Sequence, residues 1–581
     1  MSPRRTVLAI GVAAVTVAVL GAVGMTAILR DDGPPPSRST TSATAAPILD
    51  EPAVSGIGGV IVDEDAHEWN TASWDQEKIV TVGRYQYSIY WDADLHLVLA
   101  RRNLDTNAID TLRFPDRLEP DQQDDQHRST QLGVSVADGR LHVTYDHHVD
   151  ELNYRRSVAN FLSDPPKNLT RAQFSEPLDL AARHRENRNV TYVRMFNDPE
   201  GTLYASYRVG EADSGDTLLH RYDPRATAWT RVGRLFAREG EYALPDGRAS
   251  RLRNAYTNGF AFDARGRLHV VWTWRERAPR LVGFVANHDL SYAYSDDGGV
   301  TWHNDSGRRV ADLSRDDPIS IDDPGLVVLP APVGSWLLNQ GTLALDVDAQ
   351  PHIFASMSTV ETFKQDEADR RYLHVWRESE GTWQRSWVDD TTVRDAPPPV
   401  RGDIVVTPDN DVVLLFAVDG TLFTARATAA ADWSDWQFSA LGGAYASGEV
   451  SVDLERFAAE GVLTIALVEG SDDRFAFALR DLALVPTPGA PGPPAEIQTR
   501  VREQFITLRW LGGKDAQTYD VYRSAGAEQE LVARDIGARS TRLAYDDRDL
   551  EPGVMYRYVI VARNAAGTSP PSEPVTAHLD P

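Results

Sequence analysis

The sequence predicts an all-β protein: a seven-bladed β-propeller followed by a smaller β-sandwich. Short runs of alternating apolar and polar residues, bounded by Gly, Asp, Asn and Pro, extend from about Ile57 to Val485, and such runs are typical of strands. Within this region, a turn followed by an alternating strand recurs seven times, and no long helical period interrupts the pattern. After Pro494 the strand pattern continues with different motifs, which indicates a second domain.

The recurring unit predicts the propeller. Its turns lie about 60 residues apart on average, whereas a four-stranded blade needs about 40–50 residues, so longer loops would account for the excess. One such sheet cannot bury both faces alone, and a closed ring of sheets solves this problem. A large β-sandwich or a β-helix is the alternative. The turns fall near Asp94, Gly139, Gly201, Gly266, Ala349, Asn410 and Gly461.

The N-terminus indicates export. Two arginines in the first five residues precede an uninterrupted run of apolar, small or Thr residues that ends at Leu29. This run is long enough to cross a bilayer, and the arginines orient the rest of the chain outward. We expect residues 1–30 to be either a removed signal peptide or a single-span membrane anchor, and the protein to be extracellular or at the cell surface. Residues 31–56, rich in Pro, Ser, Thr and Ala, are expected to be a disordered linker.

One short motif supports the propeller assignment. The segment from Ser295 to Trp302, SDDGGVTW, matches the Asp-box pattern S-x-D-x-G-x-T-W. Its Asp-Gly turn directs a hairpin, and its Trp is expected to pack beneath that turn. The motif is a folding device, found in BNR-repeat propellers, and says little about function.

The C-terminal region resembles a fibronectin type III domain. A Pro/Gly linker, residues 486–494, separates it from the predicted propeller, residues 57–485. Residues 495–581 contain ITLRW and LEPGVMYRYVIVARNAAG, in which Leu550 and Tyr556 match the tyrosine corner of that family. The resemblance implies a β-sandwich that serves as a spacer or adhesion module.

Composition excludes several functions. The net charge of −26 disfavours binding to nucleic acid. The chain has no cysteine, which excludes disulfides, thiol catalysis and Cys-ligated zinc. A hydrophobic fraction of 42%, with 14 Trp, 20 Tyr and 17 Phe, suffices for large cores. We expect a monomer.

Residues capable of chemistry gather in the second to fourth repeats. Strand ends of neighbouring blades converge in a propeller, so a His, a Tyr and an Arg from different blades could surround one sugar. Neighbouring residues in a strand point to opposite faces, and of the pair His147-His148 we expect His147 to face the site. Arg155 is expected either to line the cleft or to be solvated. The full candidate set is His127, His147, His148, Arg155, Tyr192, Arg208 and Tyr256.

These motifs resemble the BNR-repeat propellers that include the ulvan lyases. The resemblance rests on DQHRSTQLGVSVADGRLHVTYDHHVDELNYRRS, NVTYVRMF with YASYR, and HDLSYAYSDDGGVTW. It implies a polysaccharide lyase that cleaves a uronic-acid polysaccharide by β-elimination with no metal or cofactor. The implied catalytic residues are His127, Tyr192, Arg208 and His147. Tyr256, His148 and Arg155 would bind substrate.

The implied reaction suits these side chains. The C5–H of a uronate is weakly acidic while its carboxylate is charged, so Arg208 would pair with the carboxylate and stabilise the developing enolate. Tyr192 and His127 would transfer the protons, with the phenol pKa lowered from about 10 by nearby Arg and His. His147 would orient or bind the carboxylate, and Tyr256 would hold the sugar. After the Arg the chain departs from the family pattern with VGEADSGD, which adds acidic residues beside the site.

Two other functions remain open from the sequence. A glycoside hydrolase on the same scaffold, acting on a rhamnose–glucuronate polymer or resembling a sialidase, is one, although the F/Y-R-I-P motif of sialidases is absent. A non-catalytic glycan-binding propeller at the cell surface is the other. A lyase product absorbs ultraviolet light, a hydrolase product shows only new reducing ends, and a binding protein yields neither.

Overall fold

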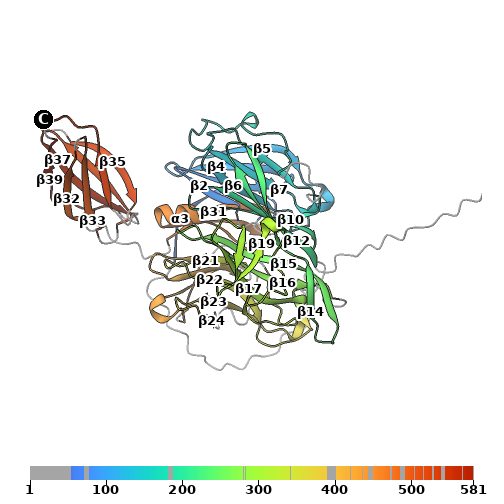
Figure 1. The fold of residues 1–581 in the computed structure, drawn as a ribbon. Coiled ribbons are helices and arrows are strands. Elements are labelled where there is room, and N and C mark those ends of the chain that lie inside the picture. Colours follow the sequence, from blue (N-terminus) through green and yellow to red (C-terminus); the bar gives the residue numbers. More distant parts are fainter. Residues whose placement is uncertain are drawn as a thin grey trace, which may run out of the picture. The chain divides into compact units, whose positions relative to one another are not determined.

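The computed structural model describes residues 54–579 apart from short gaps, and it is built mainly of β-strands (Figure 1). The predicted signal or anchor segment, 1–30, lies outside the described residues, as do most of the two predicted linkers. Across the described part of the chain, no helix combines the length and apolar character needed to cross a membrane. The gaps are 71–76, 181–187, 279, 280, 282, 340, 341, 389–400, 419, 435, 442–448, 472, 473, 484–490, 492, 503, 514, 515, 527, 528, 538–542, 565 and 566.

Two antiparallel sheets form the first part of the chain. One has the order β2-β3-β4-β5, and the next has the order β6-β7-β9, while β8 pairs with a later strand. The strands are β2 (Ile79–Val82), β3 (Tyr85–Trp91), β4 (His96–Asn103), β5 (Ile109–Arg117), β6 (Thr130–Ser135), β7 (Arg140–Tyr145), β8 (His148–Asp150) and β9 (Asn153–Arg156).

A twelve-stranded sheet follows, and it contains two antiparallel halves. The halves meet through one parallel pair, Gly215 of β12 with Asn254 of β15. Its strands are β8, whose range is given above, and β10 (Val190–Asn197), β11 (Leu203–Glu211), β12 (Ser214–Asp223), β13 (Ala228–Phe236), β14 (Glu239–Ala243), β15 (Ala249–Phe262), β16 (Leu268–Glu276), β17 (Asn287–Ser295), β18 (Thr301–His303), β19 (Arg309–Asp312) and β20 (Val327–Leu329).

Three four-stranded sheets follow, and the N-terminal strand completes the last of them. β1 pairs with β31, so this sheet has the order β1-β31-β30-β29. The strands are β1 (Ser55–Asp63), β21 (Thr342–Leu345), β22 (Pro351–Ser358), β23 (Arg370–Arg377), β24 (Trp383–Trp387), β25 (Asp403–Val406), β26 (Val412–Val418), β27 (Thr421–Ala427), β28 (Gln437–Ala440), β29 (Ser451–Asp453), β30 (Val462–Ser471) and β31 (Arg474–Ala483).

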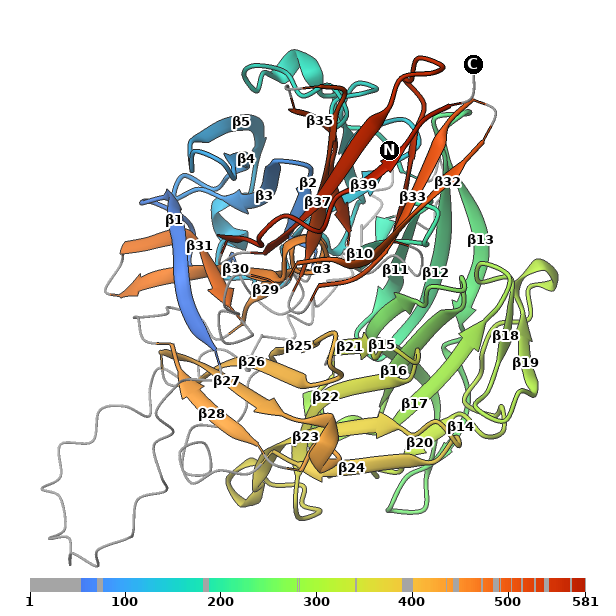
Figure 2. The ribbon, with the colours of Figure 1, turned by 90° about the vertical axis from the view of Figure 1, so that its left-hand side faces the viewer.

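These sheets stand around a common centre in chain order (Figure 2). This is the arrangement of a β-propeller, in which each sheet buries its faces against its neighbours. A cavity of about 250 Å³ lies at the centre, and one strand from each sheet or half-sheet lines it. Arg194, Asp403 and Asp453 are its buried charged residues, and burial raises the pKa of Asp403 to about 7.

The predicted turns have the backbone that the sequence indicated. Left-handed φ angles occur at Gly139 (62°), Gly201 (81°) and Gly266 (87°), and at most of the other predicted turns. In the first sheet the predicted turn near Asp94 joins β3 to β4, whereas the turn equivalent to the others is at Gly83, with φ 60°. Both turns of that sheet contain a left-handed residue and precede an alternating strand, so the sequence pattern does not distinguish them.

Within the part of the chain that the structure describes, one short α-helix interrupts the strands. α3 (Leu454–Glu460) lies between β29 and β30; Asp453 caps its start, and Gly461 ends it in the left-handed conformation. Strand periodicity alone did not predict this helix. Short 3-10 helices occupy several loops: η1 (Pro120–Gln122), η2 (Arg171–Gln173), η4 (Gly283–Ala286), η5 (Leu313–Arg315), η6 (Gln365–Glu367) and η7 (Ala429–Ala431).

The Asp box has the structure that its sequence predicts. Asp297 accepts hydrogen bonds from Thr301 N at 2.8 Å and from Thr301 Oγ1 at 2.7 Å. Trp302 is fully buried and donates from Nε1 to Gly299 O at 2.9 Å.

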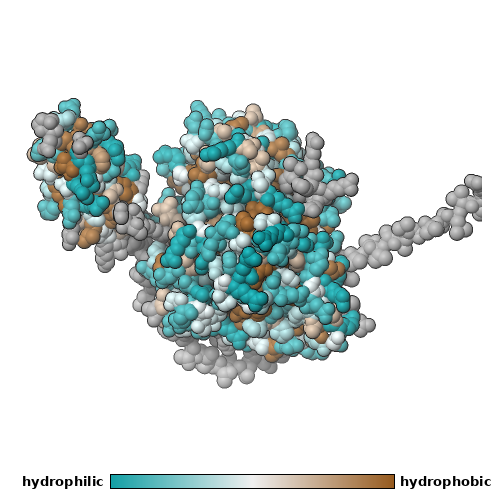
Figure 3. Space-filling model, viewed as in Figure 1, coloured by the Kyte–Doolittle hydropathy of each residue, from teal (hydrophilic) through white to brown (hydrophobic). Residues whose placement is uncertain are grey.

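The face of the molecule in Figure 3 is mostly hydrophilic, with its hydrophobic residues scattered. Such scatter is normal for a protein surface.

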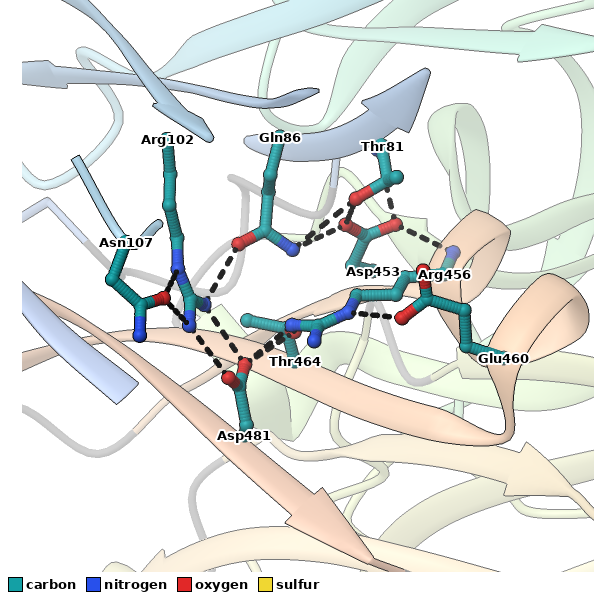
Figure 4. Close-up of polar contacts among 9 residues, drawn as sticks. All are labelled: Thr81, Gln86, Arg102, Asn107, Asp453, Arg456, Glu460, Thr464 and Asp481. Atoms are coloured by element: carbon teal, nitrogen blue, oxygen red, sulfur yellow. Dashed lines mark hydrogen bonds and ion pairs between the residues drawn. The ribbon is translucent and has the colours of Figure 1, made fainter. Parts of the chain in front are cut away.

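A buried polar network joins the first sheet to the last (Figure 4). Asp481 of β31 accepts from Arg102 of β4 at 2.7 Å and from Arg456 of α3 at 2.7 Å. Asp453 accepts from Gln86 of β3 at 2.7 Å. The ring is therefore closed both by the β1–β31 ladder and by these charge-assisted hydrogen bonds.

The C-terminal domain is a two-sheet β-sandwich. One sheet has the order β32-β33-β36, and the other joins β35, β34, β37 and the short strands β38 and β39. Glu551 N donates to Tyr556 Oη at 2.9 Å, which is the tyrosine corner predicted from the fibronectin type III resemblance. The strands are β32 (Ala495–Val501), β33 (Ile506–Leu511), β34 (Thr518–Ser524), β35 (Gln529–Gly537), β36 (Ala544–Asp547), β37 (Tyr556–Asn564), β38 (Gly567–Thr568) and β39 (Val575–Ala577).

Candidate functional site

Three of the predicted site residues meet where β10, β11 and β15 lie close together. The guanidinium carbon of Arg208 lies 4.8 Å from the ring centre of Tyr192 and 5.8 Å from that of Tyr256. The two tyrosine ring centres are 5.6 Å apart. Arg208 Nη1 donates to Tyr256 Oη at 3.4 Å, and Nη2 donates to Thr191 Oγ1 at 3.0 Å. We call Tyr192, Arg208 and Tyr256 the arginine–tyrosine cluster.

The backbone at Tyr192 is strained. Its φ is +60°, in the left-handed region that bulky residues rarely occupy. The β10–β11 ladder shifts register between Thr191 and Arg194, so Tyr192 lies in a β-bulge. Bulges re-aim side chains, and such strain of roughly 1–3 kcal/mol is typical of functional sites. The bulge gives the Tyr192 side chain a direction that regular strand alternation would not produce.

A carboxylate joins two histidines beside this cluster. His127 and His148 stack with ring centres 4.1 Å apart. Asp125 accepts from His127 Nδ1 at 2.8 Å and from His148 Nδ1 at 2.6 Å. A donating Nδ1–H makes Nε2 the basic nitrogen of each ring. The His127 ring centre lies 5.9 Å from that of Tyr192, so this histidine–aspartate trio adjoins the arginine–tyrosine cluster.

Burial separates the pKa values of the two proton-transfer candidates. It lowers the pKa of His127 to about 4, against the opposing effect of Asp125. Burial, together with Tyr256, raises the pKa of Tyr192 well above its ordinary value of 10. At neutral pH the site therefore offers a neutral imidazole as base and a protonated phenol as acid. The expected lowering of the Tyr192 pKa was wrong, because desolvation of the phenol outweighs the nearby guanidinium groups.

Tyr256 has the opposite shift. Burial alone would raise its pKa, but the charges of Arg275 and Arg208 outweigh burial and lower it. Arg275 Nη1 donates to Tyr256 Oη at 2.9 Å, and the hydroxyl donates to Ala212 O at 3.1 Å. Tyr256 is only 2% exposed, so it holds the two guanidinium groups in place from below the surface.

The structure places two of the predicted site residues elsewhere. His147 is fully buried, with Nε2 3.2 Å from Asn153 O. Arg155 forms a bidentate ion pair with Asp116, with hydrogen bonds of 2.9 and 3.1 Å. Within the described residues, neither makes a hydrogen bond or ring contact with the trio or the cluster. Consecutive residues of an extended chain face opposite sides, and here His148, not His147, turns toward His127.

Several residues of the site were missed from the sequence. Asp125 precedes His127 by two residues in DQHRS, and a carboxylate beside a candidate base was a usable signal. Arg275 ends its strand in VVWTWR much as Arg208 ends its strand in YASYR, which the repeat alignment could have revealed. Arg401, whose charge acts on Tyr192, follows the Pro-rich sequence APPPV and offered no such pattern.

The site contains buried positive charge without matching negative charge. Arg208 is only 3% exposed, and its hydrogen bonds go to hydroxyl oxygens. Arg275 donates to Tyr256, to Asn287 Oδ1 at 2.7 Å and to Asn339 Oδ1 at 2.8 Å. Among the residues that the structure describes, neither arginine has a carboxylate partner. Buried charge without a counter-charge is costly. Although the chain as a whole has a net charge of −26, this site is therefore suited to an anion.

One group of residues could hold a metal ion. Ligand atoms of Asp125, His127 and His148 lie within 4.8 Å of one another, and no other such group occurs in the described residues. In the structure the Asp125 carboxylate accepts a hydrogen bond from each of the two imidazoles. That geometry is the one by which a carboxylate orients two imidazoles for proton transfer.

Together, the ring of sheets and the side chains at the site define a β-propeller with a cationic, histidine-bearing site. A model of the BNR repeat-containing family matches residues 85–391, more than half of the 581 residues, and the chain belongs to this family.

Curated relatives of the chain are ulvan lyases. The chain is 25% identical over 272 residues to the short isoform of ulvan lyase from Alteromonas sp. (strain LOR), covering 40% of this chain and 50% of that protein. It is 21% identical over 324 residues to the long isoform from Pseudoalteromonas sp. (strain PLSV), covering 49% of this chain and 31% of that protein. The chain therefore spans half or less of the length of the curated relatives it matches.

Solved structures share the fold. The crystal structure of polysaccharide lyase Uly1 superposes with a TM-score of 0.55 at 18% identity, over 76% of this chain and 94% of that one. A PL25 ulvan lyase bound to -[GlcA(1-4)Rha3S]- superposes with a TM-score of 0.54 at 14% identity, over 72% of this chain and 95% of that one. At these identities the likeness establishes the propeller fold.

Proposed function

We propose that this protein is a polysaccharide lyase that cleaves a uronic-acid-containing, ulvan-like polysaccharide by β-elimination. The observation that carries the proposal is the buried guanidinium of Arg208, which lies against two tyrosines and has no carboxylate partner among the described residues. A uronate carboxylate supplies the missing negative charge and can accept two parallel hydrogen bonds from the guanidinium. The ulvan lyase relatives support the proposal.

The side chains suit each step of the elimination. With the carboxylate paired to Arg208, the C5–H bond becomes acidic enough to break. His127 takes this proton on Nε2, the electron pair forms the C4–C5 double bond, and the C4–O bond breaks. Tyr192 then protonates the departing oxygen. The products are a chain with an unsaturated 4,5-uronate at its non-reducing end and a chain with a new reducing end.

The product distinguishes the competing functions. Incubation with ulvan, glucuronan or a rhamnose–glucuronate polymer is expected to produce the ultraviolet absorbance of the unsaturated uronate. New reducing ends without absorbance would indicate a hydrolase, and binding without either product would indicate a glycan-binding propeller.

Replacing Tyr192 by Phe is expected to lower kcat by about 10²- to 10⁴-fold, because the leaving oxygen loses its proton donor. The ultraviolet assay measures this loss. Tyr294, a half-buried tyrosine of β17, is a matched control: Tyr294→Phe should retain activity. Full activity in Tyr192→Phe would remove the phenol from the mechanism.

The pH profile should report His127. Since its pKa is about 4 and the base must be neutral, kcat/KM is expected to rise as the pH increases through about 4 and then stay level. No alkaline decline is expected near neutrality, because the Tyr192 pKa is raised. Asp125→Asn should lower kcat/KM by about 10²-fold or more, because the His127 ring loses the carboxylate that orients it. Since Asp125 raises the pKa of His127, this variant should also move the acidic limb of the pH profile, where kcat/KM rises with pH, to lower pH.

A matched control tests that assignment. Asp150 has a half-exposed side chain that pairs with Arg128, so Asp150→Asn should leave both the rate and the acidic limb in place. If kcat/KM of the unmodified protein instead rose through about pH 6.5, the ordinary pKa of a histidine, the role of the half-buried His127 would be contradicted.

We further infer that the propeller has seven blades. Division of the twelve-stranded sheet at its single β12–β15 pair would yield two of them. Strands at seven positions line the central cavity, which supports this count: β2, β6, β10, β15, β21, β25 and β29. We also propose the domain limits 57–485 for the propeller and 495–581 for the fibronectin type III domain. Residues 1–30 would direct export as a signal or an anchor, with a monomer acting outside the cell.

A further inference from the structure

We propose that the site has a second anion-binding position, formed by Arg275 and Arg401 around Asn339. It would take an oxyanion, a sulfate ester or a carboxylate, on the sugar next to the uronate held by Arg208. This inference rests on the proposed function and extends it to the substrate's second sugar.

The two guanidinium groups share their surroundings. Asn339 accepts from Arg275 Nη2 at its side-chain oxygen, at 2.8 Å, and from Arg401 Nε at its backbone carbonyl, at 2.6 Å. The guanidinium carbons lie 5.7 Å and 5.4 Å from the ring centre of Phe284. One fully buried asparagine and one aromatic ring therefore contact both guanidinium groups. Such fixed, planar donors suit oxygen anions.

Charge at this position is unbalanced. Arg275 has only neutral hydrogen-bond acceptors among the described residues, whereas Arg401 Nη1 lies 3.4 Å from Glu449 Oε1. The guanidinium of Arg370 also acts on this position, since burial and the charge of Arg401 lower the pKa of Arg370. An incoming anion would relieve this mutual repulsion.

The acidic residues added by VGEADSGD do not supply the balance. Asp213 pairs with Arg277 at 3.0 Å, and Glu211 is exposed at the end of β11. The sequence places these acids beside the site, but in the structure Asp213 is already paired outside the cluster. The positive charge of the second position is therefore not cancelled by them.

The second position is distinct from Arg208 but adjoins it. Arg208 Nη1 and Arg275 Nη1 both donate to Tyr256 Oη, at 3.4 and 2.9 Å, so the two nitrogens lie within two hydrogen-bond lengths of each other. Arg275 is half-exposed, whereas Arg208 is buried. An anionic group on the sugar that adjoins the bound uronate can therefore reach Arg275.

The test compares three polymers: ulvan, chemically desulfated ulvan and glucuronan. Their neighbouring sugars carry a sulfate, no charge and a carboxylate, respectively. In Arg275→Gln and in Arg401→Gln, the ratio of kcat/KM on a charged neighbour to kcat/KM on desulfated ulvan should fall about 10-fold or more. Loss on ulvan alone identifies the anion as sulfate, and loss on glucuronan identifies it as carboxylate. Arg277→Gln, which removes an exposed arginine paired with Asp213, is the matched control with an unchanged ratio.

Equal loss on all three polymers in both variants would overturn the proposal, because the arginines would then act only on the uronate or on the fold. An unchanged ratio would also overturn it. If the unmodified protein yields no unsaturated product on any polymer, the proposed function fails. Affinity electrophoresis in the same polymers then decides the second position, by whether Arg275→Gln weakens retention by ulvan or glucuronan more than by desulfated ulvan.

Discussion

Replacing Arg208 by Ala is expected to lower kcat/KM on a uronate polymer by about 10³-fold, the range found when a preorganised transition-state donor is removed. Arg208 is buried against Tyr192 and Tyr256, and the alanine variant would leave the uronate carboxylate with its full negative charge next to the carbon that must lose a proton. The rate of ultraviolet absorbance increase measures the effect.

Two further variants sharpen this result. Arg208→Lys keeps the charge but loses the planar fork, so it should recover only part of the lost activity. Arg251→Ala removes an arginine whose side chain is 79% exposed, and it should leave the rate unchanged. If Arg208→Ala retained most of its activity, carboxylate neutralisation by this residue, and with it the proposed mechanism, would be wrong.

Replacing Asp481 by Ala is expected to lower the free energy of unfolding by about 3–5 kcal/mol, the cost of breaking a buried ion pair on one side. Asp481 accepts from Arg102 and Arg456, which belong to the first sheet and to α3, and its own side chain is 8% exposed. The variant leaves Arg102 buried without its carboxylate partner and leaves Arg456 paired with Glu460 alone, where the first and last sheets meet (Figure 4). Urea denaturation followed by tryptophan fluorescence measures the change.

An exposed pair is the control for Asp481. Asp246 pairs with Arg248 at the surface, with 51% of its side chain exposed, so Asp246→Ala should leave the stability nearly unchanged. Equal effects of the two variants would show that the seam network does not stabilise the ring.

The same network predicts a loss of stability in acid. Burial alone would raise the pKa of Asp481, but hydrogen bonding from Arg102 and the charge of Arg456 outweigh it and lower the pKa. Its contribution is therefore complete above the unfolded-state pKa of about 3.9 and is lost as the pH falls through the lower folded-state value. In Asp481→Ala this part of the acid sensitivity should disappear.

Much of the fold could be predicted from the sequence because its signals are local. A left-handed turn such as Gly139 or Gly266, followed by an alternating strand, is determined by residues a few positions apart. The same holds for the Asp box at Trp302 and for the tyrosine corner at Tyr556. The helix α3 was missed because its seven residues are too few to establish a helical period.

The candidate site was predicted in part. His127, Tyr192, Arg208 and Tyr256 were placed in one site from family motifs, and the structure brings them together. The sequence analysis expected His147 to face the site, but in the structure His148 does so and His147 is buried. That choice depends on where β8 begins, and strand pattern locates such a boundary only to within a few residues.

The sequence by itself determined the strand and turn pattern, the family and most of the chemical groups of the site, since each depends on residue types at short spacing. Only the tertiary structure decided which groups act on one another. Burial, and not the nearby arginines, controls the pKa of Tyr192, and Asp125 joins two histidines. Arg208 and Arg275, from different strands, both donate to the hydroxyl of Tyr256, and neither has a carboxylate partner among the described residues. The physical reason is that desolvation and charge pairing depend on distances across neighbouring sheets, which local sequence does not specify.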